Sequence, residues 1–96
     1  MNILTKSIAD VACERCVCSN SDALSSFLEL YDDQKRAVKE LAKLIKGFYE
    51  YYLRYVQNVN LNIATEVLHT ALKLVDFETA AKYCIDVYLC FTRNNN

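Results

Sequence analysis

The chain has 96 residues, of which 53% are hydrophobic, and its 11 basic and 12 acidic side chains leave a formal net charge of −1. Such a balance generates no global field that would draw the protein onto nucleic acid or an anionic membrane, so binding to either would have to be local. The length fits one domain over 1–96, and the hydrophobic content exceeds what so small a monomer easily buries, which favours association.

The fold class follows from the turn residues and the apolar period. There is no proline and only one glycine, so the residues on which hairpin turns depend are lacking. Apolar residues recur throughout with the helical period. We therefore predict an all-α fold, either a small four-helix bundle or a helical-hairpin assembly. Its expected helices span 3–17, 22–57, 60–75 and 77–92, followed by a frayed tail over 93–96.

The first predicted helix, over 3–17, is short and amphipathic, and it leads into a cluster of thiols. The cysteines of the chain are Cys13, Cys16, Cys18, Cys84 and Cys90. One CxxC pair supplies only half of a tetrahedral zinc site, so small buried apolar thiols are the simplest interpretation. A metal site or disulfides that stabilise the helical protein remain as alternatives, and an odd number of cysteines leaves at least one thiol free or intermolecular.

The second predicted helix, over 22–57, carries the longest apolar pattern. Steps of four and three give the stripe Phe27, Tyr31, Gln34, Val38, Leu41, Ile45, Phe48, Tyr52 and Tyr55. This heptad spacing is typical of a coiled-coil seam, in which Gln34 alone is polar. Its length predicts a helix that overhangs the rest of the bundle.

The polar side of the same helix carries a basic stripe. Arg36, Lys39, Lys43 and Lys46 follow one another at steps of three, four and three. Such a ridge could track phosphates, with nearby tyrosines stacking on unpaired bases. Solvated helix faces are commonly rich in lysine, however, so a nucleic-acid-binding regulator is the less favoured alternative.

The last two predicted helices meet at Asp76, which is expected to end one and to cap the other. Asn60 is the expected N-cap of the third helix. The fourth helix is apolar on nearly every face, which is typical of a helix that is buried or lies in a subunit interface.

Catalysis is not indicated. The single histidine, His69, falls on a polar helix face, and the adjacent Asp32 and Asp33 diverge around the helix instead of sharing a site. We therefore predict a protein that is not an enzyme and needs no cofactor.

Protein recognition is the preferred interpretation. The chain shows neither a signal peptide nor an apolar stretch long enough to span a membrane, so we expect a cytoplasmic protein that makes no use of a membrane. We predict a small adaptor, inhibitor or regulator that binds a protein partner and forms a homodimer. The expected interaction seam comprises Phe48, Tyr49, Tyr52, Tyr55, Val56, Tyr88 and Phe91.

Overall fold

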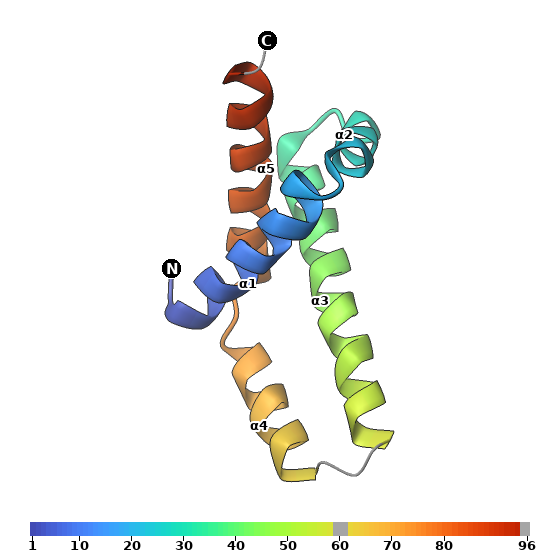
Figure 1. Ribbon diagram of the computed structural model, residues 1–96, viewed down its shortest axis with the longest axis vertical. Helices are drawn as coiled ribbons and strands as arrows, with labels where there is room; N and C mark the ends of the chain where they lie inside the picture. The colour runs from blue at the N-terminus through green and yellow to red at the C-terminus, as the bar shows by residue number, and fades with distance from the viewer. Residues whose placement is uncertain (59–61, 95–96) are drawn as a thin grey trace.

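The computed structural model describes residues 1–58 and 62–94, and the side chains of 56–58, 62–65 and 94 lie outside that description. The elements are α1 (Ile3–Cys13), the π-helical turn η1 (Glu14–Cys18), α2 (Ser21–Glu29), α3 (Gln34–Asn58), α4 (Asn62–Lys73) and α5 (Phe77–Asn94) (Figure 1). The described residues contain no strand, which confirms the prediction of an all-α fold. The predicted cap Asn60 and the last two residues fall outside the described range.

Two long helices form the axis of the molecule. α3 and α5 run antiparallel and pack side by side, and α1 crosses in front of α5 (Figure 1). α4 lies below α5 and beside the C-terminal end of α3. The resulting body measures 48 × 24 × 22 Å. The C-terminal end of α3 extends beyond α1 and α5 (Figure 1).

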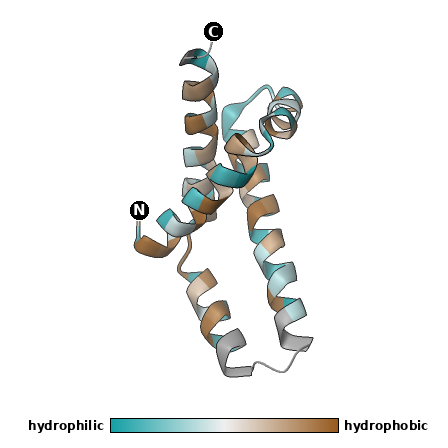
Figure 2. Ribbon diagram, viewed as in Figure 1, coloured by the Kyte–Doolittle hydropathy of each residue, from teal (hydrophilic) through white to brown (hydrophobic). Residues whose placement is uncertain are grey.

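Small side chains allow the central helices to approach closely. Ala9, Ala80 and Ala81 are completely buried, and Ala37 is almost so. Helix axes come closest where such residues meet. Larger residues fill the space around them, and Figure 2 shows hydrophobic residues along both α3 and α5. None of the helices that the structure describes is long and apolar enough to cross a membrane.

The predicted helix over 22–57 is in fact two helices. The backbone N–H of Tyr31 donates to the carbonyl of Leu28 at 3.2 Å, a tightened turn that ends α2. The carboxylate of Asp33 then accepts a 3.0 Å hydrogen bond from the N–H of Lys35 at the start of α3. This is N-cap geometry, and it restarts the helix in a new direction. The heptad stripe is therefore interrupted, and Gln34 is exposed.

The C-terminal end also differs from the prediction. α5 continues through Arg93 and Asn94, where we expected a frayed tail. Neither residue breaks a helix, and the positive charge of Arg93 suits the negative end of the helix dipole.

The N-terminus is tied to the turn between α4 and α5. The side-chain amide of Asn2 donates to the carbonyl of Leu74 at 2.8 Å, while its oxygen accepts from the N–H of Thr5 at 2.8 Å. Asn2 thus caps α1 and anchors that helix to a segment distant in the sequence.

Candidate functional site

Over residues 44–55, α3 carries a line of exposed apolar side chains, which we call the aromatic ridge. The aromatic ridge comprises Leu44, Phe48, Tyr51, Tyr52 and Tyr55. These side chains are between 54% and 74% exposed. Residues three and four apart lie on the same side of a helix, so the five form one continuous strip.

The aromatic ridge lies next to the buried face of α3, but its own side chains remain largely exposed. Leu41, Ile45 and Leu53 of the same helix are almost completely buried. Leu44 and Phe48 border the segment formed by α1 and η1 but are still more than half exposed, and Tyr51, Tyr52 and Tyr55 follow them toward the C-terminal end of α3. A strip of large apolar residues exposed in this way is typical of a binding surface.

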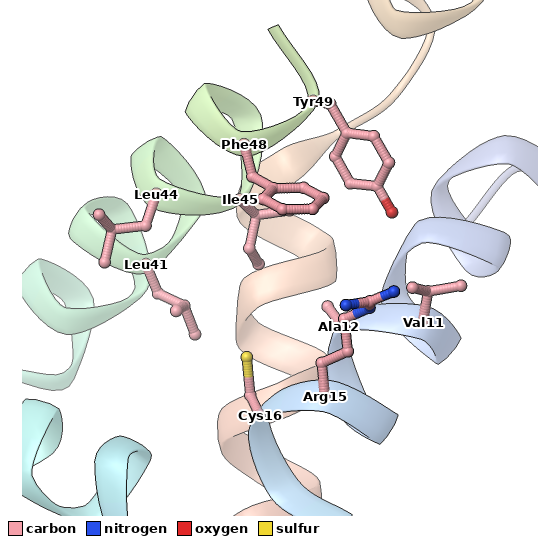
Figure 3. Close-up of a pocket in the computed structure, with 9 residues that line it drawn as sticks. All are labelled: Val11, Ala12, Arg15, Cys16, Leu41, Leu44, Ile45, Phe48 and Tyr49. Carbon is pink, nitrogen blue, oxygen red and sulfur yellow. The ribbon is translucent and has the colours of Figure 1, made fainter. Parts of the chain in front are cut away.

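A cleft of about 240 Å³ opens beside the aromatic ridge, between α3 and the segment formed by α1 and η1. Its walls are Val11, Ala12, Arg15, Cys16, Leu41, Leu44, Ile45, Phe48 and Tyr49 (Figure 3). Leu44 and Phe48 belong both to the cleft and to the aromatic ridge, so the two features form one continuous surface.

One cation lies at this cleft. The guanidinium of Arg15 is 5.9 Å from the centre of the Phe48 ring, which is the distance of a cation–π contact. Burial raises the pKa of the Tyr49 hydroxyl, and the Arg15 charge partly opposes that shift. Figure 3 shows the Tyr49 hydroxyl directed toward the side of the cleft that carries Arg15. The cleft is therefore an apolar surface with one charged group.

The structure does not bring the whole predicted seam together. Phe48, Tyr52 and Tyr55 lie on the aromatic ridge, whereas Tyr49 is half-buried and packs against the core. The side chain of Val56 lies outside the described residues.

The two seam residues of α5 are placed elsewhere. Tyr88 is half-buried against the core, and Phe91 is 54% exposed near the C-terminal end of α5. That end and the C-terminal end of α3 point in opposite directions along the molecule (Figure 1). Phe91 therefore cannot share one compact patch with the aromatic ridge.

The sequence pattern had pointed to part of this surface only. Leu44 and Tyr51 are ridge residues that fall outside the predicted seam, although both flank it at helical spacing. The sequence pattern did not indicate that Val11 and Arg15 would line the cleft, because only the packing of α1 and η1 beside α3 brings them there.

The basic stripe is partly neutralised. Lys43 lies 3.3 Å from the carboxylate of Glu40, and Lys46 lies 3.9 Å from that of Glu50. Arg36 stacks over the Tyr31 ring at 5.8 Å. The fourth member, Lys39, borders an open depression shared with α5. Two of the four cations thus face carboxylates, which weakens the field available to a phosphate backbone.

The cysteines form no disulfide, and two of them approach each other closely. Cys13 and Cys84 have their sulfurs 3.6 Å apart, Cys16 lines the cleft, and Cys18 and Cys90 are exposed. Burial is the largest cause of the raised pKa of Cys13, Cys16 and Cys84. Among the described residues, no three His, Cys, Asp or Glu side chains are arranged to hold a metal ion.

The polar residues considered for catalysis lie apart. His69 is exposed on α4 and borders an open depression with Lys46, Glu50 and Lys73. Asp33 caps α3, at a different part of the fold.

Comparisons of the chain with protein families, with characterised proteins and with solved structures find no match. The function is therefore inferred from the surface of the molecule itself.

Proposed function

We propose that this protein is a small, non-enzymatic interaction module, an adaptor, inhibitor or regulator, that self-associates through the aromatic ridge. The exposure of five large apolar side chains in one line on α3 is the observation that supports the proposal. Isolated surface hydrophobic residues are common in monomers, but a contiguous strip of this kind favours a partner.

The composition of the aromatic ridge suits a protein interface. Tyrosine buries a large area with little loss of rotamer freedom, and its hydroxyl can stay hydrated at the rim. Three of the five ridge residues are tyrosines. Interfaces depend on a few such aromatic anchors, and Phe48 is the central candidate because it joins the aromatic ridge to the cleft.

The spacing of the aromatic ridge favours pairing of two α3 helices. Leu44, Phe48, Tyr51 and Tyr55 follow one another at steps of four, three and four. This is the pattern of a short coiled-coil seam, and a two-fold axis would place the same strip on both copies. The bundle predicted from the sequence would then be completed by helices of both subunits.

Sedimentation equilibrium at micromolar concentration tests the proposal. We expect wild-type protein to approach twice the chain mass of 11.0 kDa. Tyr52→Glu should shift it to the monomer, because it buries a charge in the interface. The matched control is Lys39→Glu, which places a glutamate on the same helix at an exposed position on the side opposite the ridge.

Circular dichroism separates loss of association from loss of folding. Both variants should keep the helical signal of wild type, since both positions are exposed in the subunit. A wild-type protein that remains monomeric over the whole concentration range, or a Tyr52→Glu variant that associates as tightly as wild type, would contradict self-association through the aromatic ridge.

A further inference from the structure

Cys13 and Cys84 lie close to each other as free thiols and could form a disulfide bond. Cys13 lies at the end of α1 and Cys84 in the middle of α5, and their sulfurs are 3.6 Å apart. The Cys13 thiol donates to the Cys84 sulfur, and the Cys84 thiol donates to the carbonyl of Ala9 at 3.8 Å. Packing of α1 on α5 therefore holds both sulfurs in place, one against the other.

We propose that Cys13 and Cys84 form a reversible disulfide when the protein meets a small-molecule disulfide of the glutathione type. A disulfide bond is about 2.05 Å long, so the two sulfurs need to approach by about 1.5 Å. Side-chain rotation and a small helix shift supply such a movement without a change of fold. The link would join α1 covalently to α5.

The reaction proceeds by two exchange steps. Cys13 is half-buried while Cys84 is completely buried, so Cys13 meets the oxidant first. Its thiolate attacks one sulfur of the small disulfide, and the thiolate that leaves takes up the proton that Cys13 lost. The product is a mixed disulfide on Cys13 and one molecule of the small thiol.

Cys84 completes the reaction. Its sulfur attacks the Cys13 sulfur of the mixed disulfide, and a second small thiolate departs and takes up the proton of Cys84. Two protein thiols are thereby oxidised by two electrons to one disulfide, and one small disulfide is reduced to two thiols. Because burial raises the pKa of both protein thiols, we expect the exchange to take hours.

The consequence for the fold is large because the two cysteines are distant in the sequence. The disulfide would close a loop between positions 71 residues apart, which contains η1, α2, α3 and α4. A cross-link over so long a loop restricts the unfolded chain strongly. We expect the midpoint of thermal unfolding to rise by about 10 °C or more in the oxidised protein.

Peptide mapping after trypsin identifies the linkage. Trypsin cuts after Arg15 and so separates Cys13, in the peptide Ser7–Arg15, from Cys16 and Cys18. Cys84 and Cys90 share the peptide Tyr83–Arg93, so the experiment is repeated in Cys90→Ser to assign the link to Cys84. Reduced protein is incubated with glutathione disulfide, and free thiols are alkylated before digestion.

The expected result is a loss of two hydrogen masses from the intact chain and a cross-linked pair of these two peptides, in wild type and in Cys90→Ser alike. Cys13→Ser should abolish the pair and the rise in thermal stability, whereas Cys16→Ser should keep both. The inference is overturned if oxidation yields only glutathione adducts, or if Cys13 is linked to Cys16 or Cys18 instead. Mapping of the wild-type protein distinguishes these outcomes, and the Cys90→Ser variant, changed at an exposed position, assigns the link within the shared peptide. A cross-linked pair that disappears in Cys90→Ser would place the bond at Cys90 and would also overturn the inference.

Discussion

The hydroxyl of Thr5 accepts a 3.0 Å hydrogen bond from the backbone N–H of Asp76. Thr5 is the one polar residue that is buried among those described, and it joins the first helix to the turn before the last. Asp76 in turn caps α5, because its carboxylate accepts hydrogen bonds from the N–H and the hydroxyl of Thr79 at 3.1 and 2.7 Å. A single short chain of hydrogen bonds thus sets the position of α1, the turn and α5.

Thr5→Val should destabilise the protein by about 1–3 kcal/mol. Valine has nearly the same shape as threonine but cannot accept the hydrogen bond, so the part-buried N–H of Asp76 would lose its partner. Urea unfolding measures the change. Thr5→Ser retains the hydroxyl and should recover most of the loss. Equal destabilisation by serine and valine would mean that the methyl group, not the hydrogen bond, matters at this position.

Asp76 should make stability depend on pH in acid. The hydroxyl and then the N–H of Thr79 hold the pKa of Asp76 below its usual value of 3.8. A lowered pKa in the folded state adds stability above the unfolded value, and this stability is lost as the pH falls through the folded value. Asp76→Asn should therefore be less stable than wild type at about pH 7, and the difference should shrink at about pH 2.

Thr79→Val provides the companion test for this aspartate. It removes the hydroxyl that contributes most to the lowered pKa, so its pH dependence should fall between those of wild type and Asp76→Asn. The measurement is urea unfolding of all three proteins at both pH values. If wild type and Asp76→Asn differ in free energy of unfolding by the same amount at both pH values, the charge of the carboxylate does not contribute to stability.

Gly47→Ala should stabilise the subunit by about 0.5–1 kcal/mol. A Cβ at this exposed helical position would meet no atom within 4 Å, so alanine adds helix propensity without a clash. The gain is measured in the Tyr52→Glu background, where we expect the monomer. Gly47 is three residues from Leu44 and four from Tyr51 on the aromatic ridge. If α3 helices cross closely there, the same substitution should weaken association while it stabilises the monomer.

The sequence was sufficient to predict the fold class, because the helical period and the lack of turn residues act locally. The sequence was not sufficient to predict the break between α2 and α3 at residues 30–33. The heptad spacing continues through Tyr31 and the polar Gln34, and this continuity outweighed the capping tendency of Asp33 in the prediction. A cap with the right geometry can stop a helix that the hydrophobic pattern would continue.

The candidate site was predictable only in part. An excess of aromatic residues on one helix is visible in the sequence, and Phe48, Tyr52 and Tyr55 are indeed exposed. Which flank of α3 stays uncovered depends on how α1 packs, and that is a property of the tertiary structure. The approach of Cys13 to Cys84, across 71 positions of the sequence, could not have been foreseen for the same reason.

Asp33→Ala tests the break between α2 and α3 directly. If Asp33 caps α3, loss of its bond to the N–H of Lys35 should cost about 1 kcal/mol. If the helix instead ran unbroken from 22 to 57, alanine would be the better helix former at this position and the protein would become more stable. The two cases therefore differ in sign. Asp32→Ala, at the neighbouring exposed position, controls for the loss of one negative charge near the start of α3. We expect urea unfolding to show Asp33→Ala clearly less stable than Asp32→Ala.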